Sequence, residues 1–151
     1  MSPIAFAVLV AWCAVLTAVD LRQRRLPNAL TASGAMIIFG YALFTTQFTA
    51  AAVGAVLLAV PYLLVHLITP GALGAGDVKL AVGLGAVAAI GGAQVWVRAA
   101  MAAPVLTAAF GLAVLALRRI RSGDDRAGPQ ALPHGPAMCL ATVLSLAAAP
   151  G

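Results

Sequence analysis

The sequence predicts an all-α, polytopic membrane protein with six transmembrane helices. Of its 151 residues, 63% are hydrophobic and only 9% are charged, and the mean hydropathy is +1.05. These values exclude an ordinary soluble domain, in which about a quarter of the residues are charged. The apolar residues also gather in six stretches, separated by short polar or Gly/Pro-rich segments. We expect residues 1–151 to form a single transmembrane domain.

The first expected helix covers residues 3–19, a stretch of 17 residues at the lower limit for crossing a bilayer. No Lys or Arg precedes Asp20, and the stretch is too long for the apolar part of a signal peptide, so we expect it to be retained. Pro27 disfavours helix in the residue before it, and Asn28 is suited to cap the next helix. A second helix is therefore expected to begin here.

The next three expected helices are of two kinds. Residues 29–46 and 49–68 are ordinary apolar spans joined by a minimal turn at 47–48, and Pro61 is expected to kink the second of them. Residues 78–92 follow a Gly-rich loop and are themselves short and rich in Gly and Ala. Small side chains let neighbouring helices approach closely, which predicts that this fourth helix is buried in the bundle.

The last part of the chain predicts one long helix and one short helix. An interfacial turn is expected at residues 94–98, with Trp96 at headgroup depth, followed by a fifth helix over residues 99–117. The final apolar stretch, residues 137–149, has 13 residues, too few to cross a membrane unless the helix begins nearer Leu132. Five spanning helices are therefore the alternative to six.

The formal net charge of +5 indicates a lipid partner and not a nucleic acid. The basic residues flank apolar segments and form no stripe with interleaved aromatic residues, whereas anionic headgroups suit such flanks. Cys13 and Cys139 lie far apart within apolar stretches, and the chain has no CxxC motif. We expect both to be small buried hydrophobes and not a disulfide or a metal-binding pair.

The distribution of basic residues predicts the orientation in the membrane. With six helices, the loops after the first, third and fifth lie on one side. They hold eight of the nine basic residues: Arg22, Arg24, Arg25, Lys79, Arg118, Arg119, Arg121 and Arg126. Only Arg98 lies opposite. The positive-inside rule places these loops in the cytoplasm and both termini outside.

Two of the four acidic residues, Asp20 and Asp77, lie where apolar stretches meet polar ones. An ionisable group at such a boundary is costly and is a hint of function. The sequence around Asp77 also fits a plain helix start, with glycines, an acid in the first turn and Lys79 soon after. The predicted topology, however, brings both aspartates to the cytoplasmic edge. Paired carboxylates can share one proton, one activating water and one protonating the substrate, as in aspartic proteases.

Three motifs, in this order, resemble those of the type IV prepilin leader peptidases, which are intramembrane aspartyl proteases of the GxGD class. The first is Asp20 followed by arginines and Leu26-Pro27-Asn28. The second and most specific is Gly74-Ala75-Gly76-Asp77-Val78-Lys79-Leu80. The third is Leu132-Pro133-His134-Gly135-Pro136 before the last helix. Together they extend over nearly the whole chain.

The resemblance implies that Asp20 and Asp77 are the catalytic pair and that no cofactor is used. It implies a prepilin or pseudopilin substrate whose short basic leader is cut after a glycine at the cytoplasmic face of a prokaryotic inner membrane. The supporting motif residues are Gly74, Gly76, Lys79, Pro27, Asn28, Pro133, Gly135 and Pro136. Bifunctional members carry an N-terminal domain with two CxxC pairs. This sequence has none, so we expect no methyltransferase activity, as in the short peptidases of Flp or Tad-type systems.

Other polar residues have simpler interpretations. Lys79 is close enough to bias the charge of Asp77, and equally suits a topology signal or a lipid contact. His134 is expected to be structural. His66 lies near the same edge, but the two histidines lack close ligand spacing, so no metal site is predicted. Asp124 and Asp125 are expected to be solvated loop acids.

A transporter or proton-conducting subunit, with Asp20 and Asp77 as relay acids, is the alternative function. Relay acids usually lie near the middle of the bilayer, whereas this pair is expected at one edge. A purely structural membrane subunit would leave the paired acids unexplained. The sequence does not indicate an oligomeric state.

Overall fold

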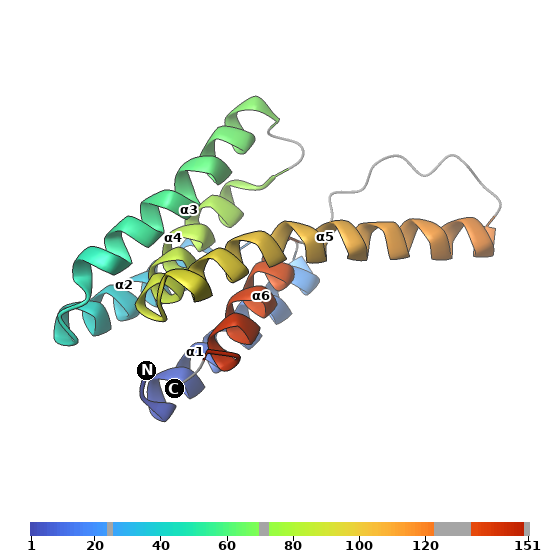
Figure 1. The fold of residues 1–151 in the computed structure, drawn as a ribbon. Helices are drawn as coiled ribbons and strands as arrows, with labels where there is room; N and C mark the ends of the chain where they lie inside the picture. Colours follow the sequence, from blue (N-terminus) through green and yellow to red (C-terminus); the bar gives the residue numbers. More distant parts are fainter. Residues whose placement is uncertain (24–25, 70–72, 123–133, 150–151) are drawn as a thin grey trace.

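The structure is a computed structural model that describes residues 1–23, 26–69, 73–122 and 134–149. These residues form an all-helical fold (Figure 1). Its six helices are α1 (Pro3–Gln23), α2 (Asn28–Phe44), α3 (Phe48–Ile68), α4 (Ala75–Ile90), α5 (Ala93–Ser122) and α6 (Gly135–Ala147). The first turn of α1 and the last turn of α6 lie at the same end of the molecule (Figure 1). The predicted all-α membrane fold is confirmed.

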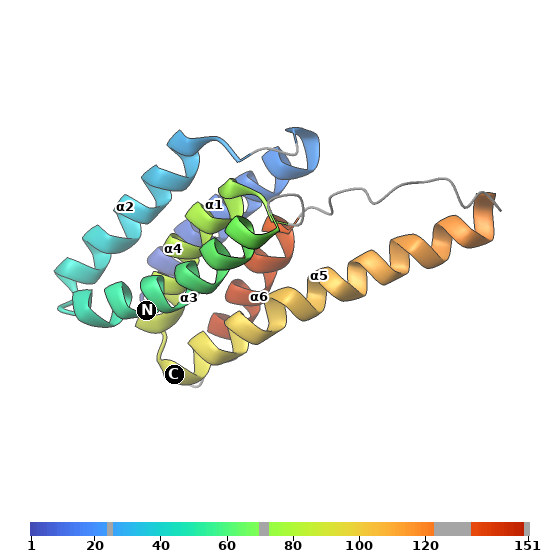
Figure 2. The same ribbon diagram turned by 90° about the horizontal axis from the view of Figure 1, so that it is seen from above.

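Helix α4 is the centre of the bundle, with contacts to α2, α3, α5 and α6 (Figure 2). Its middle turns consist mainly of buried Gly, Ala and Leu. At the contact with α3, a Cβ atom added to Gly85 would lie 2.5 Å from the carbonyl oxygen of Gly54. The two backbones therefore touch directly, which only glycine permits. This confirms the predicted burial of the small fourth helix.

Within the described ranges, three helices are long and apolar enough to cross a membrane: residues Pro3–Gln23, Phe48–Ile68 and Ala93–Val114. Helices α2 and α6 are shorter apolar helices. Large apolar side chains are exposed along α3, including Val53, Val56 and Leu57. Such a surface is stable in contact with lipid, whereas its exposure to water would be costly. The chain is therefore a polytopic membrane protein.

The predicted turn at residues 94–98 is wrong. Gly91 and Gly92 make the turn instead, Gly92 with a φ of +107°, and α5 begins at Ala93. A φ in this range is open to glycine and strained for other residues. The indole of Trp96 points into the bundle and donates to the carbonyl oxygen of Gly54 at 3.0 Å. Helix α5 also continues five residues past Leu117, and its C-terminal half extends beyond the other helices (Figures 1 and 2).

Candidate active site

Asp20 lies in the last full turn of α1 and is only 7% exposed. It is held against the beginning of α6, where the backbone of Gly135 lies close to its carboxyl group. A Cβ atom at Gly135 would lie 2.9 Å from Oδ2 of Asp20, so the close approach requires glycine. Within the described part of the chain, Oδ2 has no hydrogen-bond partner. A buried carboxylate oxygen without a donor is costly, and a proton on it removes that cost.

Asp77 lies in the first turn of α4, before the apolar part of that helix. Its backbone amide donates to the Gly74 carbonyl oxygen at 3.0 Å, and its Oδ2 accepts from the Gly74 amide at 3.2 Å. The helix N-terminus also favours a negative charge here. Burial opposes these effects and, with the nearby charge of Asp20, raises the pKa of Asp77 to about 6. A carboxyl group with this pKa exchanges its proton near neutral pH.

Both carboxyl groups line one polar cavity of about 620 Å³. Its lining comes from the end of α1, the start of α2 and the start of α4: Asp20, Gln23, Leu26, Pro27, Asn28, Gly74, Ala75, Gly76 and Asp77. The structure thus brings together two of the three predicted motifs around one space.

Leu26 connects the surroundings of the two acids. A Cβ atom at Gly76 would lie 3.1 Å from Cβ of Leu26, and one at Gly135 would lie 3.6 Å from Cδ1 of the same side chain. Gly76 precedes Asp77, and Gly135 contacts Asp20. Because these two glycines have no side chain, Leu26 can pack between the start of α4 and the start of α6, beside the two acids.

Asn28 was predicted to cap α2, but its side chain contacts Lys79 instead. The N-cap of α2 is Pro27, in extended conformation, and Asn28 is the first residue of the helix and makes no cap. Its side-chain oxygen instead accepts from Nζ of Lys79 at 2.7 Å. The cap prediction is wrong because the Asn28 side chain is engaged by α4. The bond joins the beginnings of α2 and α4 at the rim of the cavity.

The third motif is described from His134 onward, and Pro133 lies outside the described residues. Pro136 occupies the first turn of α6, where a missing amide hydrogen costs nothing. Nε2 of His134 lies 3.1 Å from the Tyr62 hydroxyl oxygen, and Nδ1 lies 2.6 Å from the Thr107 hydroxyl oxygen. Tyr62 is also within electrostatic range of Asp77. Burial lowers the pKa of His134.

Sequence reasoning missed Tyr62 and Thr107. Each is a neutral residue within an apolar helix, so neither gives a charge or motif signal of its own. Their contact with His134 depends on how α3, α5 and α6 pack. The only sign of them in the sequence is that each carries a hydroxyl group at a position where a membrane helix usually has an apolar side chain.

Several predicted features are not part of the structural description. Arg24, Arg25, Asp124, Asp125 and Arg126 lie outside the described residues, as do the side chains of Arg118, Arg119 and Arg121. His66 is described, and its Nδ1 lies 2.7 Å from the carbonyl oxygen of Leu73. In the described ranges there is no group of three or more His, Cys, Asp or Glu residues that could hold a metal ion.

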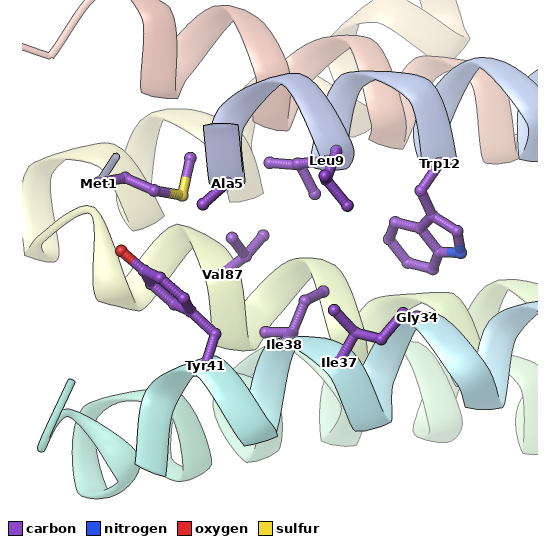
Figure 3. A pocket seen from close by; sticks show the side chains of 10 residues that line it. Met1, Ala5, Leu9, Trp12, Gly34, Ile37, Ile38, Tyr41 and Val87 are labelled. Carbon is purple, nitrogen blue, oxygen red and sulfur yellow. The ribbon is translucent and has the colours of Figure 1, made fainter. Parts of the chain in front are cut away.

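A second cavity lies between α1 and α2, as Figure 3 shows. It measures about 200 Å³ and is lined almost entirely by apolar side chains, among them Leu9, Trp12, Ile38 and Val87. Trp12 donates to the carbonyl oxygen of Leu30 at 3.0 Å. Among the described residues, the lining holds no carboxyl or imidazole side chain, and its polar groups are those of Met1, Trp12 and Tyr41.

Comparison with known proteins identifies the family of the chain. No curated protein and no solved structure matches the chain. The model of the type IV leader peptidase family matches residues 7–117, which include Asp20, Asp77 and both glycines of the second motif, and end before the third. The match extends over more than half of the sequence. The chain therefore belongs to the type IV leader peptidase family.

Proposed function

We propose that the protein is an aspartic endopeptidase that removes the leader peptide of a prepilin or pseudopilin at the cytoplasmic face of the plasma membrane. Family membership supports a leader peptidase in general. The observation that carries the aspartic mechanism is that Asp20 and Asp77 line the same polar cavity. The basic residues beside the same helix ends support a cytoplasmic position for this cavity.

In the proposed reaction the ionised Asp77 takes a proton from water while the water oxygen bonds to the scissile carbonyl carbon. Asp20 gives its proton to the carbonyl oxygen. Collapse of the tetrahedral intermediate breaks the C–N bond, and the leaving amine is protonated by the pair. The sum is one water consumed, with one carboxyl and one amino terminus formed. Because Asp77 must be ionised at the start, activity should fall as the pH drops below about 6.

The roles of the two acids follow from their surroundings. Asp77 has an amide donor and the positive end of a helix dipole, both of which favour a carboxylate. Asp20 lies at the end of α1, where the dipole opposes a negative charge, while the start of α6 beside it favours one; its Oδ2 is buried without a donor among the described residues. Arg22, two residues further along the chain, is exposed. We assign the shared proton to Asp20 on the buried Oδ2, against the raised pKa of Asp77, which taken alone favours the opposite order.

Co-expression with candidate prepilins tests the substrate class. Mass measurement of the amino terminus should show loss of the basic leader after a glycine, with no added methyl group. Candidates with an aspartate in place of that glycine are the matched control and should stay intact. Unchanged masses for all prepilins, with the protein inserted, would contradict the proposal.

A proton-conducting subunit is the competing function for the same two acids. Reconstitution of the protein in proteoliposomes separates the two functions, since a peptidase cleaves added prepilin without proton flux. Flux without cleavage would favour the relay function. The position of both acids at a helix end and a helix start, and not in mid-helix, supports the peptidase.

A further inference from the structure

His134 is held by two hydrogen bonds whose directions can be deduced. The Thr107 hydroxyl has one hydrogen, and it donates this hydrogen to the Ala103 carbonyl oxygen at 3.0 Å. Toward Nδ1 of His134, at 2.6 Å, the Thr107 oxygen can then only accept. Nδ1 must therefore carry a hydrogen. In the neutral imidazole this leaves a lone pair on Nε2, which accepts from the Tyr62 hydroxyl at 3.1 Å.

This arrangement links His134 to both acids of the candidate site. The backbone of the next residue, Gly135, lies close to the carboxyl group of Asp20. On the other side, Tyr62 stacks at a tilt on the His134 ring, with centroids 5.5 Å apart, and is within electrostatic range of Asp77. Tyr62 belongs to α3, Thr107 to α5, and His134 directly precedes α6. The three side chains thus fix the beginning of α6 against two other helices.

Protonation of His134 would reverse the direction of one of these two bonds and keep the other. A charged imidazole carries a hydrogen on both nitrogens, so Nδ1 still donates to Thr107, but Nε2 can no longer accept from Tyr62. The Tyr62 hydroxyl would have to turn round and accept. The orientation of Tyr62 therefore reports the charge of His134.

We propose that His134 is a positioning residue of the peptidase, active as the neutral Nδ1–H tautomer, and that its protonation reorients Tyr62 and switches the site off. The proposal rests on the proposed peptidase function for its effect on activity. The tautomer and the titration of His134 do not depend on that function.

The surroundings of His134 have opposing effects on its protonation. The described titratable groups on the surrounding elements are Cys13, Asp20 and Arg22 on α1, Tyr62 and His66 on α3, Asp77 and Lys79 on α4, Arg98 on α5, and Cys139 on α6. From α5 the facing group is the neutral Thr107. Carboxylates favour the charged imidazole, whereas burial favours the neutral one. Burial prevails and lowers the pKa of His134, which keeps the ring neutral at cytoplasmic pH.

The two partners of His134 predict opposite shifts of its titration. Tyr62→Phe removes a hydroxyl that donates to the neutral ring. Among the described residues, this hydroxyl could accept from the charged ring only by leaving its own hydrogen without an acceptor, so the titration should move to higher pH. Thr107→Val removes a hydrogen-bond acceptor that stabilises the charged ring more than the neutral ring, so the titration should move to lower pH. A residue with a merely structural role would give no such pair of opposite shifts.

Nuclear magnetic resonance of protein labelled with ¹⁵N-histidine tests this directly, because the chain has only two histidines. A His66→Asn variant assigns the signals. The wild-type His134 should show the Nδ1–H tautomer at pH 7.5, and the pH titration should shift upward in Tyr62→Phe and downward in Thr107→Val. An Nε2–H tautomer, or shifts of the same sign, would overturn the proposal.

Matched variants and an activity profile complete the test. Tyr41→Phe removes the hydroxyl of the other tyrosine, and Thr45→Val removes a similar bond to a carbonyl oxygen four residues earlier, 2.9 Å long. Neither should move the His134 signals. The acid limb of prepilin cleavage, to which Asp77 and His134 both contribute, should move to lower pH together with the His134 titration in Thr107→Val, which keeps Tyr62. An unmoved limb in that variant would overturn the switch. If the proposed peptidase function is wrong, the wild-type protein itself will cleave no prepilin, and this result is distinct from the outcomes above.

Discussion

The two aspartates have the same chemistry but different surroundings, and the difference supports the roles proposed for them. Asp77 begins a helix and accepts a backbone hydrogen bond, whereas Asp20 ends a helix and has a buried oxygen with no hydrogen-bond partner among the described residues. Helix dipoles contribute about 0.3 to 1 kcal/mol when exposed and up to about 2 kcal/mol when partly buried. This is enough to decide which member of a pair keeps a shared proton.

Infrared difference spectroscopy tests this assignment. Near neutral pH the wild-type protein should show the stretch of a protonated carboxyl group, and this signal should vanish in Asp20→Asn. It should remain in Asp77→Asn, where Asp20 is still protonated. Survival in Asp20→Asn with loss in Asp77→Asn would reverse the roles.

Gly135 is the residue whose replacement should damage the site with the least effect elsewhere. In Gly135→Ala the new methyl group would lie 2.9 Å from Oδ2 of Asp20, and the helix backbone allows little relief. We expect cleavage to fall at least about tenfold, because misplacement of a catalytic group by about 1 Å can cost 100-fold. Gly40→Ala is the control, since a Cβ there meets nothing within 4 Å. Equal activity of the two variants would show that the contact is unimportant.

At the scale of the helices, the direct contact of α3 and α4 holds the centre of the bundle. A Cβ at Gly85 would lie 2.5 Å from the Gly54 carbonyl oxygen and 2.9 Å from Cβ of Leu58. Backbone atoms cannot turn away as a flexible side chain can. The start of α4, which carries Asp77, therefore depends on glycines two to three turns further along the helix.

Gly85→Ala should lower the stability of the folded protein by about 1 to 3 kcal/mol, the usual cost of overpacking. Thermal unfolding in detergent should show a lower Tm than the wild type. Gly40→Ala on α2 should leave the Tm unchanged or raise it, because alanine favours an exposed helix position by up to about 1 kcal/mol. An unchanged Tm in Gly85→Ala would contradict the close packing.

The sequence predicted the helices better than it predicted the contacts between them. Six apolar stretches were sufficient for six helices, because the membrane leaves few other structures for an apolar chain. The turn at residues 94–98 was misplaced, since Trp96 and Arg98 look interfacial while the glycines before them make the turn. The interactions of Asn28 with Lys79, and of His134 with Tyr62 and Thr107, join residues far apart in the chain. Local propensity carries no information about such pairs.

At the scale of the whole molecule, the orientation in the membrane decides whether the polar cavity can meet a cytoplasmic leader. The basic residues are distributed eight to one between the two sides that six helices define. An asymmetry of this size sets orientation through the positive-inside rule. We therefore propose that the end of α1 and the start of α4 lie at the cytoplasmic face together with the end of α5.

Cysteine labelling from each side of the membrane tests the orientation. After Cys13 and Cys139 are changed to Ala, a cysteine replacing Ser122 should react only with reagent on the cytoplasmic side. A cysteine replacing Gln47, in the turn between α2 and α3, should react only from outside. The reverse pattern would place both aspartates on the wrong face for the proposed substrate.

The measurement that tests the central claim most directly is prepilin cleavage by Asp20→Asn and Asp77→Asn at wild-type protein levels. Each amide keeps the shape of the side chain but cannot exchange a proton near neutral pH, so both variants should insert normally and cleave no substrate. Asp124→Asn, the matched control, should cleave as the wild type does. Full cleavage by either Asp20→Asn or Asp77→Asn would contradict the paired-aspartate mechanism.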